Sequence, residues 1–388
     1  MSEFILLHGA RQLLTLQGPS GARRGAALHD LGLIEDGSVL IRDHSIFALG
    51  NSRRIENLKE ARNALNIDVR GGIVMPGFVD AGLTISRTVR SLTAGPAKVK
   101  KPRQMYDESL ALMRSCLQHG TLTAELKSGA EAEDFRSDIP LLRQLAKIGK
   151  NPVEIVRTWR IQRWPREERE LRDFQQTLET VARRKLVKYV EFAADHMPCG
   201  HRDLMQAVRR VRLALKLVWK GGDPALLEAL LEDADPHVVI CSPALNEAEI
   251  SLLTSSRAIL VLAPGNELGR PSGYALRELT NAGAAIALSS GYDEKLSPGF
   301  SMQMAISLAV AQGQLTPEQA IAAATVNAAH AVGCEHIIGT LECEKRADIL
   351  VMMVPDYHQL PRQFGINNVS IVVRDGKLIR TRLEARAK

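Results

Sequence analysis

The side chains best suited to binding chemistry in this chain are basic residues at or just beyond the ends of apolar, strand-like runs. They are Arg87, Arg90, Lys127, Arg160, Arg163 and Lys220. Guanidinium and ammonium groups hold carboxylates and phosphates by charge-assisted hydrogen bonds. If the runs are parallel strands of a barrel, their carboxyl ends meet at the face where barrels bind ligands. The set therefore predicts a site for a small anionic ligand.

One acidic residue belongs to the same set. Glu125 lies two positions before Lys127, and alternation along a strand places both side chains on one face. This spacing favours an ion pair inside the barrel mouth. A competing interpretation has the arginines pointing outward and the mouth closed by Trp159, Trp164 and Trp219.

Metal or nucleophilic chemistry has fewer candidates. If a metal ion is bound, the residues available near strand ends are Asp195, His196, Cys241 and Asp293. Cys241 could also act as a nucleophile if a base lowered its pKa, but the sequence names no such base. A loop histidine is more often a surface group, and a strand-end cysteine more often fills apolar space. We therefore expect no metal and no cofactor.

Composition is that of a soluble globular protein. Of 388 residues, 45% are hydrophobic and 24% charged, and no apolar run approaches the roughly 20 residues that cross a bilayer. The five cysteines contain no C-x-x-C pair, and the first residues show no basic leader, so a reducing cytoplasm is expected. The net charge is +6, but acidic residues interleave with the basic runs. We expect neither nucleic-acid nor membrane partners.

Strand-like and helix-like segments alternate through the middle of the chain. Apolar runs bounded by turn residues lie at 73–79, 120–126, 153–158, 187–193, 214–218, 237–241, 258–262 and 284–288. Segments of helical period lie at 106–119, 138–148, 174–184, 203–212 and 247–253. Eight strand and helix units predict an α/β fold of the (β/α)8 TIM-barrel type.

The two ends of the chain have a different pattern, with short strands in place of alternating strands and helices. Short strands are expected at 37–41 and 45–48, and two more near the C-terminus surround the turn Asp375-Gly376. A helix at 317–332 begins with a threonine cap and a proline. We expect residues 1–70 and 347–388 to form one small β-rich domain, and residues 71–346 to form the barrel.

Several motifs resemble the amidohydrolase superfamily, and within it the imidazolonepropionases. The motifs are PGFVDA at 76–81, GTLTAELKSG at 120–129, ATVNAAHAVG at 324–333, IIGTLECEKRADILV at 337–351 and PDYHQLPRQFGINNV at 355–369. In that family, metal-bound water attacks a carbon–nitrogen bond. The resemblance also implies a homodimer.

The resemblance fails at the metal ligands. The family's two first-strand histidines, its fifth- and sixth-strand histidines and its eighth-strand aspartate match Gly82, Thr84, Val218, Cys241 and Gly291. None of these is a strong zinc ligand in this setting except the cysteine. The stretch 160–163 also replaces the family's Gly-Ala-His.

The sequence therefore predicts a cytoplasmic protein that has lost metal-dependent hydrolysis and serves a binding, scaffold or regulatory role. It would be a pseudoenzyme, with a small anion at the barrel mouth. The alternative is an active hydrolase of non-peptide carbon–nitrogen bonds with an atypical or metal-free site.

Overall fold

The computed structural model describes residues 3–86, 99–129, 135–149, 152–161, 164–194, 201–241, 244–267, 276–294, 297, 299–312 and 314–381. Five candidate residues lie outside these ranges: Arg87, Arg90, Arg163, Asp195 and His196. The chain divides into two compact units. Unit 1 comprises residues 1–79, 116–122 and 301–388, and unit 2 comprises residues 80–115 and 123–300.

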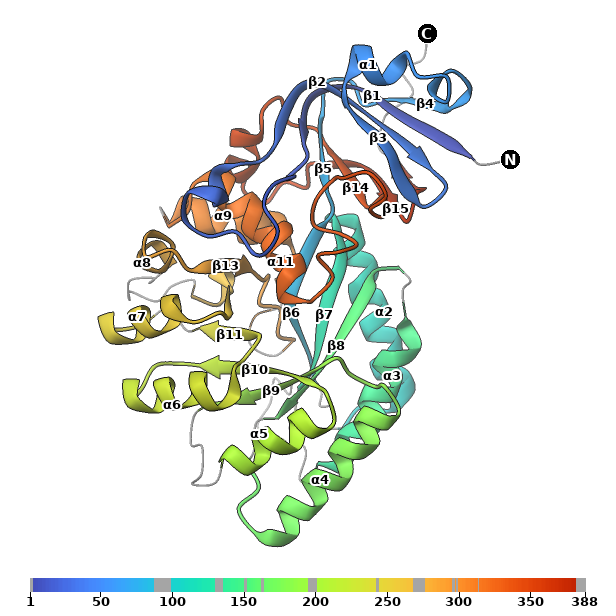
Figure 1. The fold of residues 1–388 in the computed structure, drawn as a ribbon. Helices are drawn as coiled ribbons and strands as arrows, with labels where there is room; N and C mark the ends of the chain where they lie inside the picture. Colours follow the sequence, from blue (N-terminus) through green and yellow to red (C-terminus); the bar gives the residue numbers. More distant parts are fainter. Residues whose placement is uncertain are drawn as a thin grey trace. The chain divides into compact units, whose positions relative to one another are not determined.

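An eight-stranded parallel sheet runs through unit 2, in the strand order β6 to β13 (Figure 1). Its strands are β6 (Phe78–Ser86), β7 (Thr121–Gly129), β8 (Glu154–Ile161), β9 (Tyr189–Ala193), β10 (Ala214–Trp219), β11 (Val238–Cys241), β12 (Ile259–Leu262) and β13 (Ala285–Leu288). The helices between them are α2 (Pro102–Gln118), α3 (Ile139–Ile148), α4 (Glu168–Arg183), α5 (His201–Arg210), α6 (Pro224–Ala234), α7 (Glu247–Ser255) and α8 (Leu276–Asn281), with 3-10 turns at Arg136–Asp138 and Pro264–Glu267. The predicted TIM-type barrel is confirmed.

The register of the barrel strands decides which side chains face inward. Arg160 on β8 pairs with Glu191 on β9, and Glu191 pairs with Lys216 on β10. Registered residues of parallel strands share a face. Three charged residues of adjacent strands therefore lie side by side in the interior.

Side chains and a few backbone bonds close the barrel between β13 and β6. The backbone N–H of Thr84 donates to the carbonyl of Tyr292 over 2.7 Å. Ser289 Oγ lies 3.0 Å from Asp80 Oδ1 and 2.8 Å from the carbonyl of Gly82. The first and last strands are thus joined mainly at Asp80 and the residues just after β13.

Unit 1 holds a mixed sheet in the order β16-β15-β14-β5-β1-β2-β3, with β4 beside β1. The elements are β1 (Phe4–Leu14), η1 (Gly25–His29), β2 (Leu33–Arg42), β3 (Ser45–Asn51), α1 (Ser52–Glu56), η2 (Ala61–Asn63), β4 (Leu65–Asp68), β5 (Ile73–Pro76), α9 (Met302–Ala311), α10 (Pro317–Ala324), α11 (Val326–Ala331), β14 (Ile349–Met352), η5 (Tyr357–Arg362), β15 (Val369–Arg374) and β16 (Lys377–Thr381). β5 pairs with both β1 and β14, so N- and C-terminal strands share one sheet, as predicted. The hairpin turn at Asp375-Gly376 is also confirmed, with positive φ at both residues.

The predicted first barrel strand, 73–79, is wrong in one respect, because the run serves two sheets. Its first half is β5 in the mixed sheet, and the barrel strand β6 starts only at Phe78. Gly77 lies at the break, where its N–H donates to the carbonyl of Asp348 over 3.0 Å. A Cβ at this glycine would come within 2.5 Å of Leu122 Cδ1, so only glycine fits there.

The helix predicted at 317–332 is two helices. The predicted threonine cap at Thr316 is confirmed, and it forms a capping box with Gln319. Thr325 then leaves helical geometry and separates α10 from α11. The compact units place residues 301–346 with the terminal strands. The domain boundaries expected from the sequence instead assign residues 301–346 to the barrel, and these boundaries stay a prediction.

Among the described residues, no helix is long and apolar enough to span a membrane.

Candidate functional site

The centre of the site is a buried carboxylate between two cations. Lys127 Nζ lies 2.6 Å from Glu191 Oε2, and Arg160 Nε lies 3.2 Å from Glu191 Oε1. The side chains of Glu191, Lys127 and Arg160 are 1%, 7% and 21% exposed. Burial alone would raise the pKa of Glu191, but the charges of Lys127 and Arg160 hold it below its ordinary value. We call these three residues the ion triad.

A second ion pair lies beside the triad. Lys216 Nζ donates to Glu125 Oε2 over 2.9 Å, and Thr158 Oγ1 donates to Glu125 Oε1. Lys216 Nζ also lies 4.2 Å from the centre of the Tyr189 ring. Burial lowers the pKa of Lys216, and the charge of Glu125 offsets part of this change. Glu125 and Lys127 both face the interior as predicted, but each is paired with a partner from another strand.

The ion triad extends to the two first-strand positions where histidines were expected from the resemblance. Arg160 Nη1 donates to Thr84 Oγ1 over 3.4 Å. A Cβ at Gly82 would lie 3.1 Å from Lys127 Cε and 3.2 Å from Lys127 Nζ. The lysine ammonium and the arginine guanidinium therefore line the inner face of β6.

The triad leaves a hydrogen-bond donor unused. Among the described buried atoms, Arg160 Nε and Glu191 Oε2 have no hydrogen bond of good geometry, although each lies within ion-pair distance of a charged partner in the triad. The N–H at Arg160 Nε is not aligned with any acceptor. Buried polar groups are nearly always hydrogen-bonded, so the N–H at Arg160 Nε calls for an acceptor on a ligand or a water molecule.

Asp80 is a fully buried residue on β6, the strand that also carries Gly82 and Thr84. Its Oδ1 accepts from the N–H groups of Gly82 and Ser290, both at 3.1 Å, and from Ser289 Oγ. Its Oδ2 has no hydrogen-bond partner among the described residues. Burial raises the pKa of Asp80 to about 6, although the hydrogen bonds from Ser290, Ser289 and Gly82 act in the opposite direction.

The eighth-strand position is closed to a larger side chain. Gly291 has a φ of +67°, and a Cβ there would lie 2.6 Å from Ala263 Cβ and 2.7 Å from Asn266 Oδ1. An aspartate at this position would need a different loop conformation. Asp293, two residues after Gly291, is half-buried and forms an isolated backbone bridge with Thr84.

The strand register places Val218 and Cys241 on opposite faces of the barrel sheet. Val218 pairs with Ile240, two positions along β10 from the inward-facing Lys216, so Val218 and Ile240 face the interior. Cys241 pairs with Trp219 on the outer face. Burial, together with the nearby charge of Glu249, raises the pKa of the Cys241 thiol. The interior residues of β11 are therefore Val238 and Ile240, and Cys241 is not one of them.

The interpretation in which three tryptophans close the mouth is wrong. Trp159 stacks on Phe174 of α4, and its indole N–H donates to Asp138. Trp164 stacks on Phe192, and Trp219 donates to Glu249 of α7. Trp159 and Trp219 lie on the outer side of the barrel strands, because their neighbours Arg160 and Val218 face inward. Trp164 packs on Phe192, which lies on the outer face of β9 because its neighbour Glu191 faces inward.

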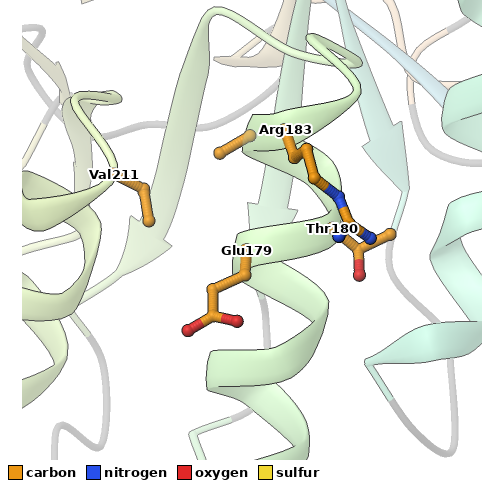
Figure 2. A pocket seen from close by; sticks show the side chains of 5 residues that line it. Glu179, Thr180, Arg183 and Val211 are labelled. Atoms are coloured by element: carbon orange, nitrogen blue, oxygen red, sulfur yellow. The ribbon is translucent and has the colours of Figure 1, made fainter.

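The other expected cation of the described chain, Lys220, is exposed just after β10 and is not in the ion triad. A surface hollow of about 400 Å³ lies elsewhere in unit 2, lined by Glu179, Thr180, Ala182, Arg183 and Val211 (Figure 2). Figure 2 shows Glu179, Thr180 and Arg183 along α4 with Val211 opposite them. None of the candidate residues lines it.

Sequence reasoning missed Glu191, on which the triad depends. The available signal was a single acidic residue inside the apolar run at 187–193. A buried charge in a strand calls for a partner, and Lys127 and Arg160 were already candidates. Asp80 was noticed only as part of a motif.

A transition metal would need several donors that the described interior does not offer together. Among the residues that the structure describes, no group of three or more His, Cys, Asp or Glu side chains is placed to hold a metal ion. Two of the positions matched to family ligands, Gly82 and Gly291, are glycines crowded by their neighbours. The donors of the described residues thus do not fit a divalent metal, and Asp195 and His196 lie outside them.

Comparison with known proteins points to one superfamily. Residues 188–379 match the model of the Amidohydrolase family. The imidazolonepropionase of Alkaliphilus metalliredigens (strain QYMF) is 27% identical, with 97% of each chain covered. That of Geobacillus kaustophilus (strain HTA426) is 29% identical, again with 97% of each chain covered.

Two solved structures show the same fold at low identity. The A. niger ochratoxinase has a TM-score of 0.73 at 14% identity, with 98% of this chain and 96% of that chain covered. A mutant atrazine chlorohydrolase from Arthrobacter aurescens TC1, complexed with zinc and atraton, has a TM-score of 0.72 at 15% identity, with 97% and 95% covered.

Proposed function

Because this chain is an imidazolonepropionase-like protein of the amidohydrolase superfamily, we propose that it is a member without metal-dependent hydrolysis that binds a small anion inside the barrel mouth. The role would be that of a binding, scaffold or regulatory protein. The observation that carries the proposal is the ion triad, in which two cations share one carboxylate.

The charge balance of the triad supports an anion as the ligand. Glu191 neutralises one of its two partners, so one positive charge remains at Lys127 and Arg160. Lys127 and Arg160 contact the two different oxygens of the same carboxylate, so both charges lie beside Glu191. A carboxylate or phosphate would supply both the negative charge and the missing acceptor.

The same residues argue against water activation by a metal. In the superfamily a bound divalent ion would supply an activated water. Here the matched positions carry Gly82, Thr84, Val218 and Gly291, and Cys241 lies on the outer face.

Anion titrations test the proposal. Calorimetry with sodium acetate and with inorganic phosphate should give measurable binding to the full chain. Arg160→Met should weaken it at least about tenfold, since hydrogen bonds to charged groups contribute about 1.5–3 kcal/mol. Arg169→Met, the same change on an exposed residue of α4, should leave it unchanged. Equal affinities in both variants would contradict the proposal.

The alternative is an active carbon–nitrogen hydrolase, favoured by relatives that are named as enzymes over nearly their whole length. A metal would then have to use Asp195, His196, Cys241 or Asp293, or the mechanism would be metal-free. Elemental analysis of protein purified without chelators separates the two functions. Stoichiometric zinc, iron or manganese that is lost together with hydrolase activity would favour the alternative.

A further inference from the structure

We infer that unit 2 carries a docking surface for an acidic segment of another protein, at the amino-terminal edge of its barrel sheet. The surface consists of exposed basic residues on the two turns that border the hollow of Figure 2: Arg183, Arg184, Lys185, Arg209, Arg210 and Arg212. We call these six residues the basic surface. The inference goes beyond the proposed anion site, because it uses no residue of the barrel interior.

The order of the barrel strands brings the two turns together. Residues 183–188 lead into β9, and residues 209–213 lead into β10. Ala214 pairs with Tyr189, so the two strands begin side by side. Two segments that are separate in the sequence therefore form one surface at the edge where these strands start.

The two turns account for the excess positive charge of the chain. Residues 179–188 and 209–213 contain seven basic residues and one acidic residue, Glu179, which gives a net charge of +6. The whole chain also has a net charge of +6, so the charges of all other residues balance. No Asp or Glu occurs at 180–188 or at 204–213. Acidic residues therefore do not interleave with the basic ones at this edge of the sheet.

Carboxylates of the neighbouring helices are engaged elsewhere or lie at the border. Asp173 Oδ1 of α4 and Asp233 Oδ2 of α6 form ion pairs with other arginines, over 2.5 Å and 2.7 Å. Glu232 and Asp235, near the end of α6, are exposed. They precede β11, the strand next to β10, and so limit the surface on that side. The basic surface is thus left for an anionic partner.

The hollow adds a place for one apolar side chain. It has a volume of about 400 Å³, and Ala182 and Val211 give it an apolar lining beside Arg183 (Figure 2). Cations around an apolar depression fit a run of aspartates or glutamates that carries one aliphatic residue. None of the described residues that line the hollow is aromatic. Single-stranded nucleic acids stack on aromatic side chains, so an acidic protein segment is favoured over RNA.

Both turns keep a basic residue where glycine would fit better. The N–H groups of Leu186 and Leu213 donate to the carbonyl five residues earlier, over 3.0 Å and 3.4 Å, so α4 and α5 end alike. The residues before these leucines, Lys185 and Arg212, have φ of +50° and +58°, a conformation that favours glycine. The helix dipole accounts for basic residues in the last turns, whereas these two lie beyond the helix ends. Keeping a charged side chain in a strained turn points to a role other than stability.

Binding of a synthetic acidic peptide tests the inference. The probe is a fluorescein-labelled peptide of glutamates with one central leucine, and fluorescence anisotropy follows its binding to the full chain at low salt. Lys185→Gly/Arg212→Gly should lower the affinity at least about fivefold, because two exposed charges that face the peptide are lost. The melting temperature of this variant should not fall, since glycine adopts the left-handed turn without strain. Arg166→Gln/Arg169→Gln removes the same charge from exposed positions at the other end of α4, and its affinity should stay within about twofold of the wild type.

Two further variants separate the hollow and the barrel interior from the basic surface. Ala182→Leu fills the hollow without changing the charge, so the peptide with leucine should lose its advantage over a peptide of glutamates alone. Arg160→Met should bind the acidic peptide as the wild type does. Acetate and phosphate binding should in turn be unchanged in Lys185→Gly/Arg212→Gly.

Equal peptide affinity of the wild type and Lys185→Gly/Arg212→Gly would overturn the inference, as would a wild type that does not bind the peptide. Tighter binding of single-stranded RNA or of phosphatidylserine vesicles than of the peptide would overturn the assignment to a protein partner. Loss of peptide binding in Arg160→Met would place the binding in the barrel interior and also overturn it. Absence of acetate and phosphate binding would overturn only the proposed function.

Discussion

Arg160 and Thr84 lie on strands that are not neighbours, yet Arg160 Nη1 donates to Thr84 Oγ1 over 3.4 Å. The guanidinium therefore reaches across β7 to the inner face of β6. Its other contact, Glu191 on β9, lies on the opposite side of β8. One side chain thus links three strands through the barrel interior, and the predictions below follow from this arrangement and from its buried neighbours.

Removing the shared carboxylate should destabilise the fold strongly. Glu191→Gln leaves Lys127 and Arg160 without a counter-charge in a buried position. We expect a loss of about 3–5 kcal/mol in the free energy of unfolding, measured in urea. Glu168→Gln, at a side chain that is 83% exposed, should change it by less than about 0.5 kcal/mol. Similar values for the two variants would show that the triad contributes little to stability.

Asp80 should make stability fall as pH rises. Its pKa is about 6 in the folded chain against 3.8 as the ordinary value, chiefly because of burial. The folded state therefore favours the protonated form. The favourable contribution is complete below about pH 4 and is lost between about pH 4 and pH 6, amounting to about 3 kcal/mol.

The comparison that isolates this effect is Asp80→Asn, which stays neutral. Between pH 4 and pH 7 the unfolding free energy of the wild type should fall by about 2 kcal/mol relative to this variant. The control is Asp107→Asn, at an exposed position of α2, for which the difference in unfolding free energy from the wild type should not depend on pH. A pH-independent difference for Asp80→Asn as well would mean that its carboxyl titrates normally.

The loop after β13 should reject even a methyl group. Gly291→Ala combines a positive φ with a contact of 2.6 Å to Ala263 Cβ, and should cost about 2–4 kcal/mol. Gly283→Ala is the matched control, because its φ is also positive but nothing lies within 4 Å of the added Cβ. It should cost only about 1–2 kcal/mol. Equal losses, measured by urea unfolding, would show that the loop adapts to the larger residue.

Thiol reactivity should separate the cysteines. Cys343 is exposed, whereas Cys241 is buried and its pKa is raised. Native protein treated with iodoacetamide at pH 8 should be alkylated at Cys343 first, with Cys241 at least about tenfold slower by mass spectrometry. Fast modification of Cys241 would restore it as a nucleophile candidate.

Much of the barrel was predictable because its strands are continuous apolar runs bounded by turns. The run at 153–158 gave β8, although the strand continues to Ile161. The extension carries Arg160, whose charge is satisfied by Glu191, and hydrophobic pattern alone cannot show that. The break at Gly77 was likewise invisible, because one apolar run is shared between two sheets.

The site was predictable only in part, because the strand register decides which side chains face the barrel interior. Lys127 and Arg160 were placed in the mouth from their positions at strand ends. Cys241 was matched to an interior ligand, yet a one-residue difference puts Ile240 inside instead. Partners were the hardest to predict, since Glu191 meets Lys127 and Arg160 only after three separate strands are assembled.

The hydrogen bond between Asp80 and Ser289 also helps to close the barrel. A carboxyl and a hydroxyl fasten the first strand to the last where the backbone ladder is sparse. The fold therefore depends on this aspartate independently of any chemistry at the site.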